Sequence, residues 1–199
     1  MVCLACGRWC PESLCPACNE TLVPAAERLL GDGLLIRAPF RHEGTARSLV
    51  RLLKYRGLLE VAEYLAERMA PLLLPSAAAL VPVPRALVRR LRYGVDPAAE
   101  LAAAIGRRTG LPVVAALRAP LWWPRHAGRG REQRREISFA GRMPTLSGAA
   151  LVDDVATTGV TLLAARAALK GLPTLAVTAT SVGRVATGEY PTHRVREVT

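Results

Sequence analysis

The sequence predicts an α/β protein, with a parallel sheet flanked by helices and a small N-terminal segment that a metal ion holds together. Apolar runs of strand length alternate with helical segments between residues 34 and 182, which is typical of βαβ units. All five cysteines lie between Cys3 and Cys18. The chain has 199 residues and is 51% hydrophobic, so it can bury one sizeable core beside a small accessory unit. We therefore expect one domain at residues 1–22 and a second at residues 23–199.

The N-terminal segment is expected to bind structural Zn²⁺. Cys3-x-x-Cys6 and Cys15-x-x-Cys18 offer four thiolates, which suits tetrahedral zinc. One such pair is compatible with redox chemistry, whereas two pairs in so short a segment favour zinc. Cys10 is then a spare thiol or an alternative ligand. Because residues 1–22 are too few to form an apolar core, zinc binding would supply their folding free energy.

The larger domain is predicted from hydrophobic periodicity and from the positions of glycine and proline. Pro82 and Pro84 cannot donate hydrogen bonds to a sheet, so the strand that contains them should leave the sheet at its far end. The expected elements are a strand at 34–40, a helix at 44–55 closed by Gly57, a helix at 58–74 ended by Pro75, a strand at 79–84, a loop at 85–96, a helix at 97–108 capped by Gly110, strands at 113–117 and 149–155, a helix at 161–169 and a strand at 174–182.

The strand at 149–155 and the loop after it carry the most informative pattern. Asp153 and Asp154 follow a buried apolar run, and two neighbouring carboxylates there are costly unless a partner such as a diol pairs with them. The next residues offer backbone amides, threonine hydroxyls and a flexible glycine to a phosphate. These phosphate-binding candidates are Val155, Ala156, Thr157, Thr158, Gly159, Val160 and Thr161. The alternative is an ordinary turn in which Thr161 is only a helix N-cap.

The charge of the chain favours anionic ligands. The net charge is +11, and only Lys54 and Lys170 among the 27 basic residues are lysine. Codon composition can account for the excess of arginine, but the surface still attracts phosphorylated molecules, nucleic acid or acidic partners. The Gly-rich Lys-Ser/Thr loop of P-loop nucleotidases and the Gly-x-Gly-x-x-Gly motif are both missing from the sequence.

A connector at residues 118–142 is rich in arginine and begins with two tryptophans. Aromatic rings beside arginines are typical of single-stranded nucleic-acid binding. The alternative is a solvated loop whose tryptophans pack as a hood over the ribose site. The nucleic-acid candidates are Trp122, Trp123, Arg125, Arg129, Arg131, Arg134 and Arg135.

Residues 151–161 resemble the ribose-phosphate motif of type I phosphoribosyltransferases, and the whole chain resembles the ComF family of competence proteins. The family features are the cysteine pairs, Leu53-Lys54-Tyr55 with Gly57, Val81-Pro82-Val83-Pro84, Arg92-Tyr93-Gly94, the arginine-rich connector and the Asp-Asp loop, in family order. The resemblance implies a phosphoribosyltransferase-like fold and binding of 5-phosphoribosyl-1-pyrophosphate with Mg²⁺. It implies that Asp153 and Asp154 bind the ribose and that Pro84, Arg85 and Arg92 lie near the pyrophosphate.

The resemblance also sets the expected function. ComF proteins act in DNA uptake during natural transformation, so we expect a protein that binds the sugar pyrophosphate and helps to handle single-stranded DNA, with other DNA-uptake proteins as further partners. Residues 93–97 depart from the family pattern, which leaves transferase activity open. The alternatives are an active phosphoribosyltransferase of nucleotide salvage and a regulatory sensor of ribosyl phosphates.

The apolar runs are too short to cross a membrane, and the N-terminus does not resemble a secretory signal. The expected location is the cytoplasm, without membrane insertion.

Overall fold

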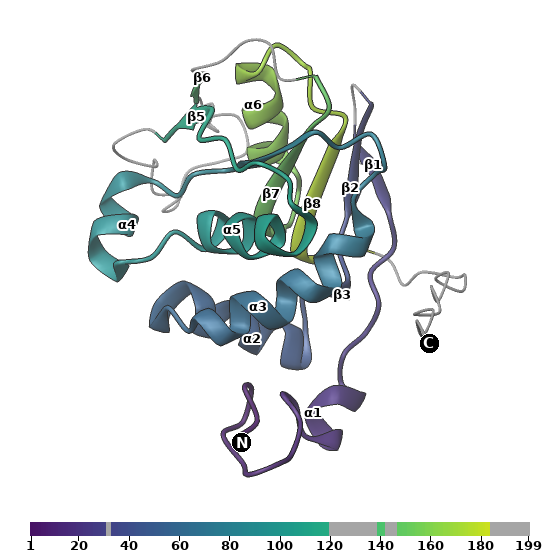
Figure 1. Ribbon diagram of the computed structural model, residues 1–199, viewed down its shortest axis with the longest axis vertical. Coiled ribbons are helices and arrows are strands. Elements are labelled where there is room, and N and C mark those ends of the chain that lie inside the picture. Colours follow the sequence, from purple (N-terminus) through teal and green to yellow (C-terminus); the bar gives the residue numbers. More distant parts are fainter. Residues whose placement is uncertain (31–32, 120–138, 142–146, 184–199) are drawn as a thin grey trace, which may run out of the picture.

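The computed structural model describes residues 1–30, 33–119, 139–141 and 147–183, and shows an α/β protein with a mixed, mostly parallel sheet (Figure 1). The strands of this sheet are β1 (Arg28–Leu30), β2 (Leu34–Arg37), β3 (Phe40–Arg41), β4 (Ala79–Pro82), β7 (Ala149–Ala156) and β8 (Leu175–Ser181). Their order is β1-β2-β8-β7-β4, and β3 also pairs with β8. All pairs are parallel except β1 with β2, so the predicted parallel sheet carries one antiparallel edge strand that the sequence did not reveal.

The predicted strand at 34–40 is divided into β2 and β3. Both segments pair with β8, and Ala38 and Pro39 lie between them. Proline has no backbone N–H, so a ladder cannot continue through Pro39 without losing a bond.

The helices are α1 (Pro16–Glu20), α2 (Gly44–Arg56), α3 (Leu59–Met69), α4 (Leu87–Tyr93), α5 (Pro97–Thr109) and α6 (Val160–Ala168), with a short 3₁₀ turn at Ala70–Leu72. Of these, α2, α3, α5 and α6 correspond to the helices predicted from the periodicity of the sequence. Gly57 and Gly110 end α2 and α5 in the left-handed conformation that only glycine adopts readily, with φ of 62° and 75°. Within the part of the chain that is described, no helix is both long and apolar enough to cross a membrane.

Two predicted elements are wrong. The expected loop at 85–96 contains helix α4, which Gly94 ends. The expected strand at 113–117 makes only one bridge, from Val113 to Leu80, before β5 (Leu117–Arg118) pairs with β6 (Ala140–Gly141). The pairing with β4 stops after Leu80 because the next residue of β4 that would donate a hydrogen bond to this segment is Pro82. Proline has no N–H, so it cannot extend the pairing.

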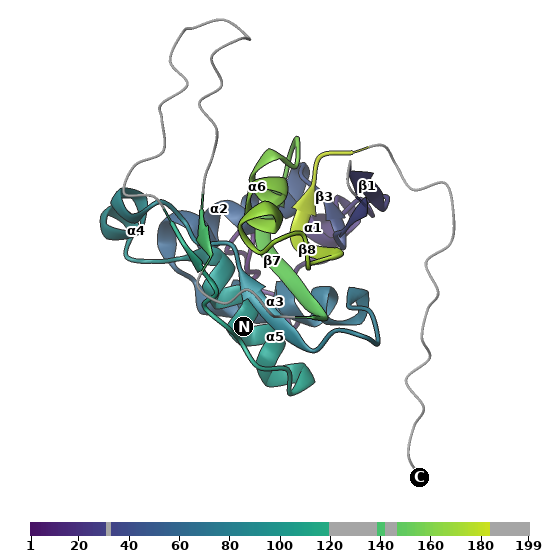
Figure 2. The same cartoon turned by 90° about the horizontal axis from the view of Figure 1, so that it is seen from above.

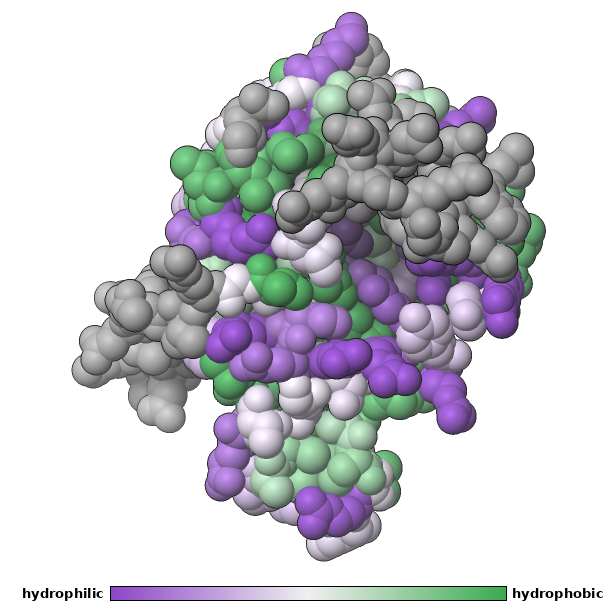
Figure 3. Space-filling view, turned by 180° about the vertical axis from the view of Figure 1, so that it is seen from behind, coloured by the Kyte–Doolittle hydropathy of each residue, from purple (hydrophilic) through white to green (hydrophobic). Residues whose placement is uncertain are grey.

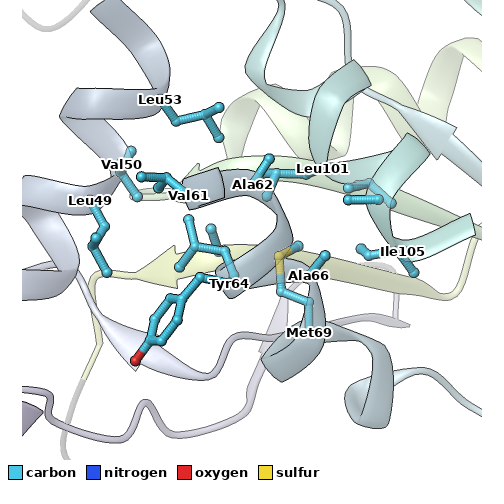
Figure 4. Close-up of a cluster of buried hydrophobic side chains, with 14 of the residues drawn as sticks. Leu49, Val50, Leu53, Val61, Ala62, Tyr64, Ala66, Met69, Leu101 and Ile105 are labelled. Atoms are coloured by element: carbon cyan, nitrogen blue, oxygen red, sulfur yellow. The ribbon is translucent and has the colours of Figure 1, made fainter. Parts of the chain in front are cut away.

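The sheet has a core on each face, because successive strand residues point to opposite sides. Ala150 and Val152 of β7 pack with α2, α3 and α5, whereas Ala149 and Leu151 pack with α6. Figure 2 shows the sheet between α6 on one side and α3 and α5 on the other. Figure 4 shows how side chains of α2, α3 and α5 interlock in the first core, with Leu53, Leu101 and Ile105 among them.

The N-terminal lobe, residues 1–22, projects from the body at the bottom of Figures 1 and 3. It is nevertheless joined to the larger core, since Cys3, Cys10 and Leu14 belong to the same buried cluster as Leu49 of α2. A hydrogen bond of 2.7 Å from the Thr21 hydroxyl to the Thr45 hydroxyl connects the lobe to α2. Unfolding of the N-terminal lobe should therefore lower the stability of the larger domain.

Candidate functional site

The four cysteines predicted to bind metal come together in the N-terminal lobe. Their sulfur atoms all lie within 4.8 Å of one another, and the Cys6 and Cys15 sulfurs are 3.7 Å apart. Tetrahedral Zn²⁺ with bonds of about 2.3 Å requires sulfur atoms about 3.8 Å apart, so the group has the right size. Helix α1 begins directly after Cys15, with Pro16 in its first turn, and thereby presents Cys15 and Cys18 from one rigid turn. These cysteines can hold a metal ion such as zinc.

Cys10 lies outside this group. Its thiol donates a hydrogen bond of 2.9 Å to the carbonyl of Glu12. Burial raises the pKa of Cys10, which favours the neutral thiol, whereas the pKa of Cys6 is lowered, chiefly because the Arg8 side chain donates a hydrogen bond to it. Cys10 is therefore the spare thiol of the lobe.

The predicted ribose-binding carboxylates lie at the carboxyl end of the parallel sheet. Asp153 and Asp154 occupy the last part of β7, beside Thr178 and Thr180 of β8. In open α/β sheets, ligands bind beyond the carboxyl ends of the strands, because loops and helix N-termini converge there. The assignment of these residues to ribose stays a prediction.

The two carboxyl groups have different environments. Burial raises the pKa of Asp153 well above its ordinary value, and repulsion from Asp154 raises it further. Asp154 instead pairs with Lys54 of α2, whose ammonium nitrogen lies 2.9 Å from the carboxylate in a setting where the Asp154 side chain is only 13% exposed. One aspartate is thus biased toward the neutral acid and the other is an ion-paired carboxylate, so the pair can both donate and accept hydrogen bonds.

His42 completes this polar group. It follows β3, so it also emerges at the carboxyl end of a strand parallel to β8. Its Nδ1 lies 2.8 Å from the hydroxyl of Thr180. Burial lowers the pKa of His42, and the nearby Lys54 and Arg47 lower it further, so the imidazole is neutral at pH 7.

The predicted phosphate loop leads from β7 into α6. Thr157 and Thr158 are exposed, and Gly159 occupies the helix N-cap with φ of 84°. The amide of Leu163 bonds to the Gly159 carbonyl at 2.9 Å, so the amides of the first turn before it remain available to an anion. Gly159 rather than Thr161 is the N-cap, which removes the alternative role considered for that threonine.

Arg28 of β1 fixes the position of this loop. Its Nη1 donates hydrogen bonds to the carbonyl of Thr157 at 2.7 Å and to the carbonyl of Val182 at 2.9 Å. Leu30, from the same strand, lies so close to Gly159 that a Cβ at that position would overlap its side chain. Strand β1, which the sequence did not predict, therefore positions the loop through Arg28 and Leu30.

The residues expected near a pyrophosphate lie at the end of β4. Pro84 and Arg85 follow this strand, which pairs with β7 up to Val152. The Arg85 guanidinium donates a hydrogen bond of 2.9 Å to the carbonyl of Lys54, and the Arg85 amide donates to Asp96 at 3.2 Å. The structure therefore brings Arg85 to the residue that pairs with Asp154.

The remaining predicted site residues are Arg92 and the nucleic-acid candidates of the connector. Arg92 lies on α4, with its guanidinium carbon 5.4 Å from the centre of the Tyr93 ring. Trp122, Trp123 and the arginines 125, 129, 131, 134 and 135 lie outside the described residues.

Sequence reasoning missed Lys54, His42 and Arg28 as parts of the site. Lys54 carried a signal, because it is one of two lysines in a chain that otherwise uses arginine. His42 carried none that set it apart, because it is a single histidine two residues after the strand predicted at 34–40. Arg28 carried none, because its role depends on a short antiparallel strand that has no periodicity of its own.

Replacing Asp153 by asparagine is expected to stabilise the fold at pH 8. An acid whose pKa is higher in the folded protein loses stability as the pH rises through the interval between its unfolded and folded pKa values. Asparagine cannot ionise, and it can still accept the 2.8 Å hydrogen bond from the Asp154 amide. We expect a gain of about 0.5–2 kcal/mol in the free energy of unfolding at pH 8 and a smaller gain at pH 5.

Urea unfolding at the two pH values measures this gain. Asp154→Asn is the matched control, and it should lower stability because it leaves Lys54 without its partner. Equal effects of Asp153→Asn at pH 5 and pH 8 would contradict the assignment.

The chain gives no match in comparisons with models of known protein families and with curated proteins.

Proposed function

We propose that this chain is a ComF-like protein that binds 5-phosphoribosyl-1-pyrophosphate at the carboxyl end of its sheet. The proposal rests above all on one observation, the placement of Asp153 and Asp154 at the end of a buried strand, directly before a loop with free amides and exposed threonines. Adjacent carboxyl groups suit the adjacent hydroxyls of a ribose, and the loop suits its 5′-phosphate.

The pyrophosphate of the ligand would face the basic side of the site. Arg85 donates a hydrogen bond to the carbonyl of Lys54, the ammonium group of Lys54 pairs with Asp154, and Arg92 lies on the following helix. Mg²⁺ accompanies the sugar pyrophosphate as part of the ligand and offsets its charge. Ribose hydroxyls would compete with Lys54 for Asp154, which would release the ammonium group toward the pyrophosphate.

The wider role that we propose is the handling of single-stranded DNA during DNA uptake, with structural Zn²⁺ in the N-terminal lobe. The net charge of +11 supports a polyanionic partner. The resemblance to ComF proteins supports DNA as that partner and the cytoplasm as the location.

Calorimetric titration of the zinc-loaded protein with the Mg²⁺ complex of 5-phosphoribosyl-1-pyrophosphate tests the proposal. We expect one saturable site and a loss of at least tenfold in affinity for ribose 5-phosphate, which lacks the pyrophosphate. Equal affinity for pyrophosphate alone would show that ribose is not recognised and would contradict the proposal. Release of pyrophosphate in the presence of a nucleobase would instead assign the active transferase.

A further inference from the structure

Helix α4 differs from α2, α3, α5 and α6 because none of its residues is buried. Leu91 is 76% exposed, and Leu87 and Val88 are also exposed. Seven residues are too few for a helix to be stable in water through its own hydrogen bonds, so such an element usually depends on packing. The surface of α4 is therefore available to a partner that would also stabilise it.

Two tyrosines connect α4 to the end of α2. The rings of Tyr55 and Tyr93 meet edge to face, with centroids 5.0 Å apart and an angle of 68° between their planes. Figures 1 and 2 both show α4 beside α2. Tyr55 remains 48% exposed, although a tyrosine that served only the core would be buried. The pair presents aromatic surface to solvent.

Arginine surrounds these rings. The guanidinium carbon of Arg85 lies 4.7 Å from the centre of the Tyr93 ring and 5.7 Å from that of Tyr55. Hydrogen bonds from Arg85 to Lys54 and Asp96 hold it there. Asp96, which accepts the hydrogen bond from the Arg85 amide, is buried, and burial raises its pKa.

Other arginines of α2 and α4 form no ion pair in the described part of the chain, although the charge of Arg90 lowers the pKa of Asp96. Among the described residues, no ion pair involves the following arginines: Arg51, Arg56, Arg89, Arg90 and Arg92. By contrast, Arg107 and Arg108 on α5 both pair with Glu63. Arginines without an ion pair, on the same two helices as the tyrosines, are complementary to a chain of phosphates that carries stackable groups.

We propose that Tyr55, Tyr93 and the arginines around them form a binding surface for single-stranded nucleic acid. Exposed aromatic rings stack on unpaired bases of any sequence, and arginines pair with the phosphates between them. A duplex offers these rings no open base face, and an acidic peptide without aromatic side chains offers them no ring to stack on. The proposal rests on the proposed function, for which it names the surface that contacts the strand.

This surface is directly connected to the ribose-phosphate site. Tyr55 follows Lys54, whose side chain pairs with Asp154 and whose carbonyl holds Arg85. A ligand that displaces Lys54 from Asp154 would therefore act on a residue next to the stacking pair. The two sites are neighbours on one helix end rather than separate modules.

Fluorescence anisotropy with a labelled oligothymidine of about 20 nucleotides tests the surface on the full, zinc-loaded chain. We expect Tyr55→Ala/Tyr93→Ala to lower the affinity about tenfold or more, because stacking is lost, and Tyr55→Phe/Tyr93→Phe to stay within about twofold of wild type. Arg89→Gln/Arg90→Gln should reduce the dependence of log affinity on log salt by about one to two. Arg107→Gln/Arg108→Gln removes the same charge elsewhere and should preserve most of the affinity.

Three results would overturn the proposal: failure of the wild-type protein to bind the oligothymidine, equal affinity of the tyrosine-to-alanine variant, and equally tight binding of duplex DNA with the same loss in that variant. Titration of the same variants with 5-phosphoribosyl-1-pyrophosphate separates this proposal from the proposed function. Loss of oligothymidine binding alone would support the surface, whereas absence of sugar-pyrophosphate binding in every protein would refute the ribose-phosphate site and leave the surface standing.

Discussion

Replacing Cys15 by serine is expected to release the metal from the N-terminal lobe and to lower the free energy of unfolding by about 3 kcal/mol or more. Serine is a poor zinc ligand, and the lobe has too few apolar residues to fold without its metal. The effect should reach the body, because Cys3, Cys10, Leu14 and Cys15 share a buried cluster with α2 and α3. For a chain of 199 residues, a loss of about 3 kcal/mol corresponds to a fall of roughly 6–12 °C in Tm.

Zinc content by atomic absorption and thermal unfolding measure the two parts of this prediction. Cys10→Ser is the matched control, because Cys10 donates only to the Glu12 carbonyl and serine can make the same bond. We expect Cys10→Ser to retain the metal and to cost less than about 1 kcal/mol. A Cys15→Ser protein with full metal content, or with an unchanged Tm, would refute the structural role.

Replacing Gly159 by alanine is expected to cost about 2–4 kcal/mol of stability and to abolish tight binding of the sugar pyrophosphate. The φ of 84° is strained for a residue with a Cβ, and the new Cβ would overlap the Leu30 side chain. The overlap is relieved either by a shift of the Leu30 side chain or by movement of the loop away from β1, which would break the hydrogen bond from Arg28 to the Thr157 carbonyl. Urea unfolding and calorimetric titration measure the two effects.

Gly110→Ala separates the strain of a positive φ from the overlap with the Leu30 side chain. Gly110 has a similar φ of 75°, but nothing lies within 4 Å of an added Cβ. This variant should cost only about 1–2 kcal/mol and should leave ligand affinity unchanged. If Gly159→Ala bound the ligand as wild type does, the loop would not be the phosphate site.

The core elements could be predicted because their signals are local. The periodicities of α2, α3 and α5, with glycine after α2 and α5, fixed these helices to within a few residues, and the apolar run before Asp153 fixed β7. The grouping of the four cysteines that could hold a metal followed from their spacing alone. In each case the residues that determine the element lie within it or directly beside it in the sequence.

The missed features depend on contacts between distant segments. Helix α4 was assigned to a loop because Arg89, Arg90 and Arg92 interrupt its apolar positions, and no buried face marks it. The pairing of Lys54 with Asp154 joins residues 100 positions apart, and the support of the phosphate loop by Arg28 spans 129. Such pairs arise from the sheet order β2-β8-β7, which local patterns do not determine.

Calorimetric titration of Asp153→Asn/Asp154→Asn with the Mg²⁺ complex of 5-phosphoribosyl-1-pyrophosphate tests the central claim most directly. Both asparagines keep the size of the side chains, so the loop stays in place while the negative charge that accepts the ribose hydroxyls is removed. We predict that wild type binds and that the variant, folded by circular dichroism and with full zinc content, binds at least about 100-fold more weakly, equivalent to roughly 2.7 kcal/mol. Binding of equal strength by both proteins would show that the ligand does not use these carboxyl groups, and would contradict the assignment of the ribose site.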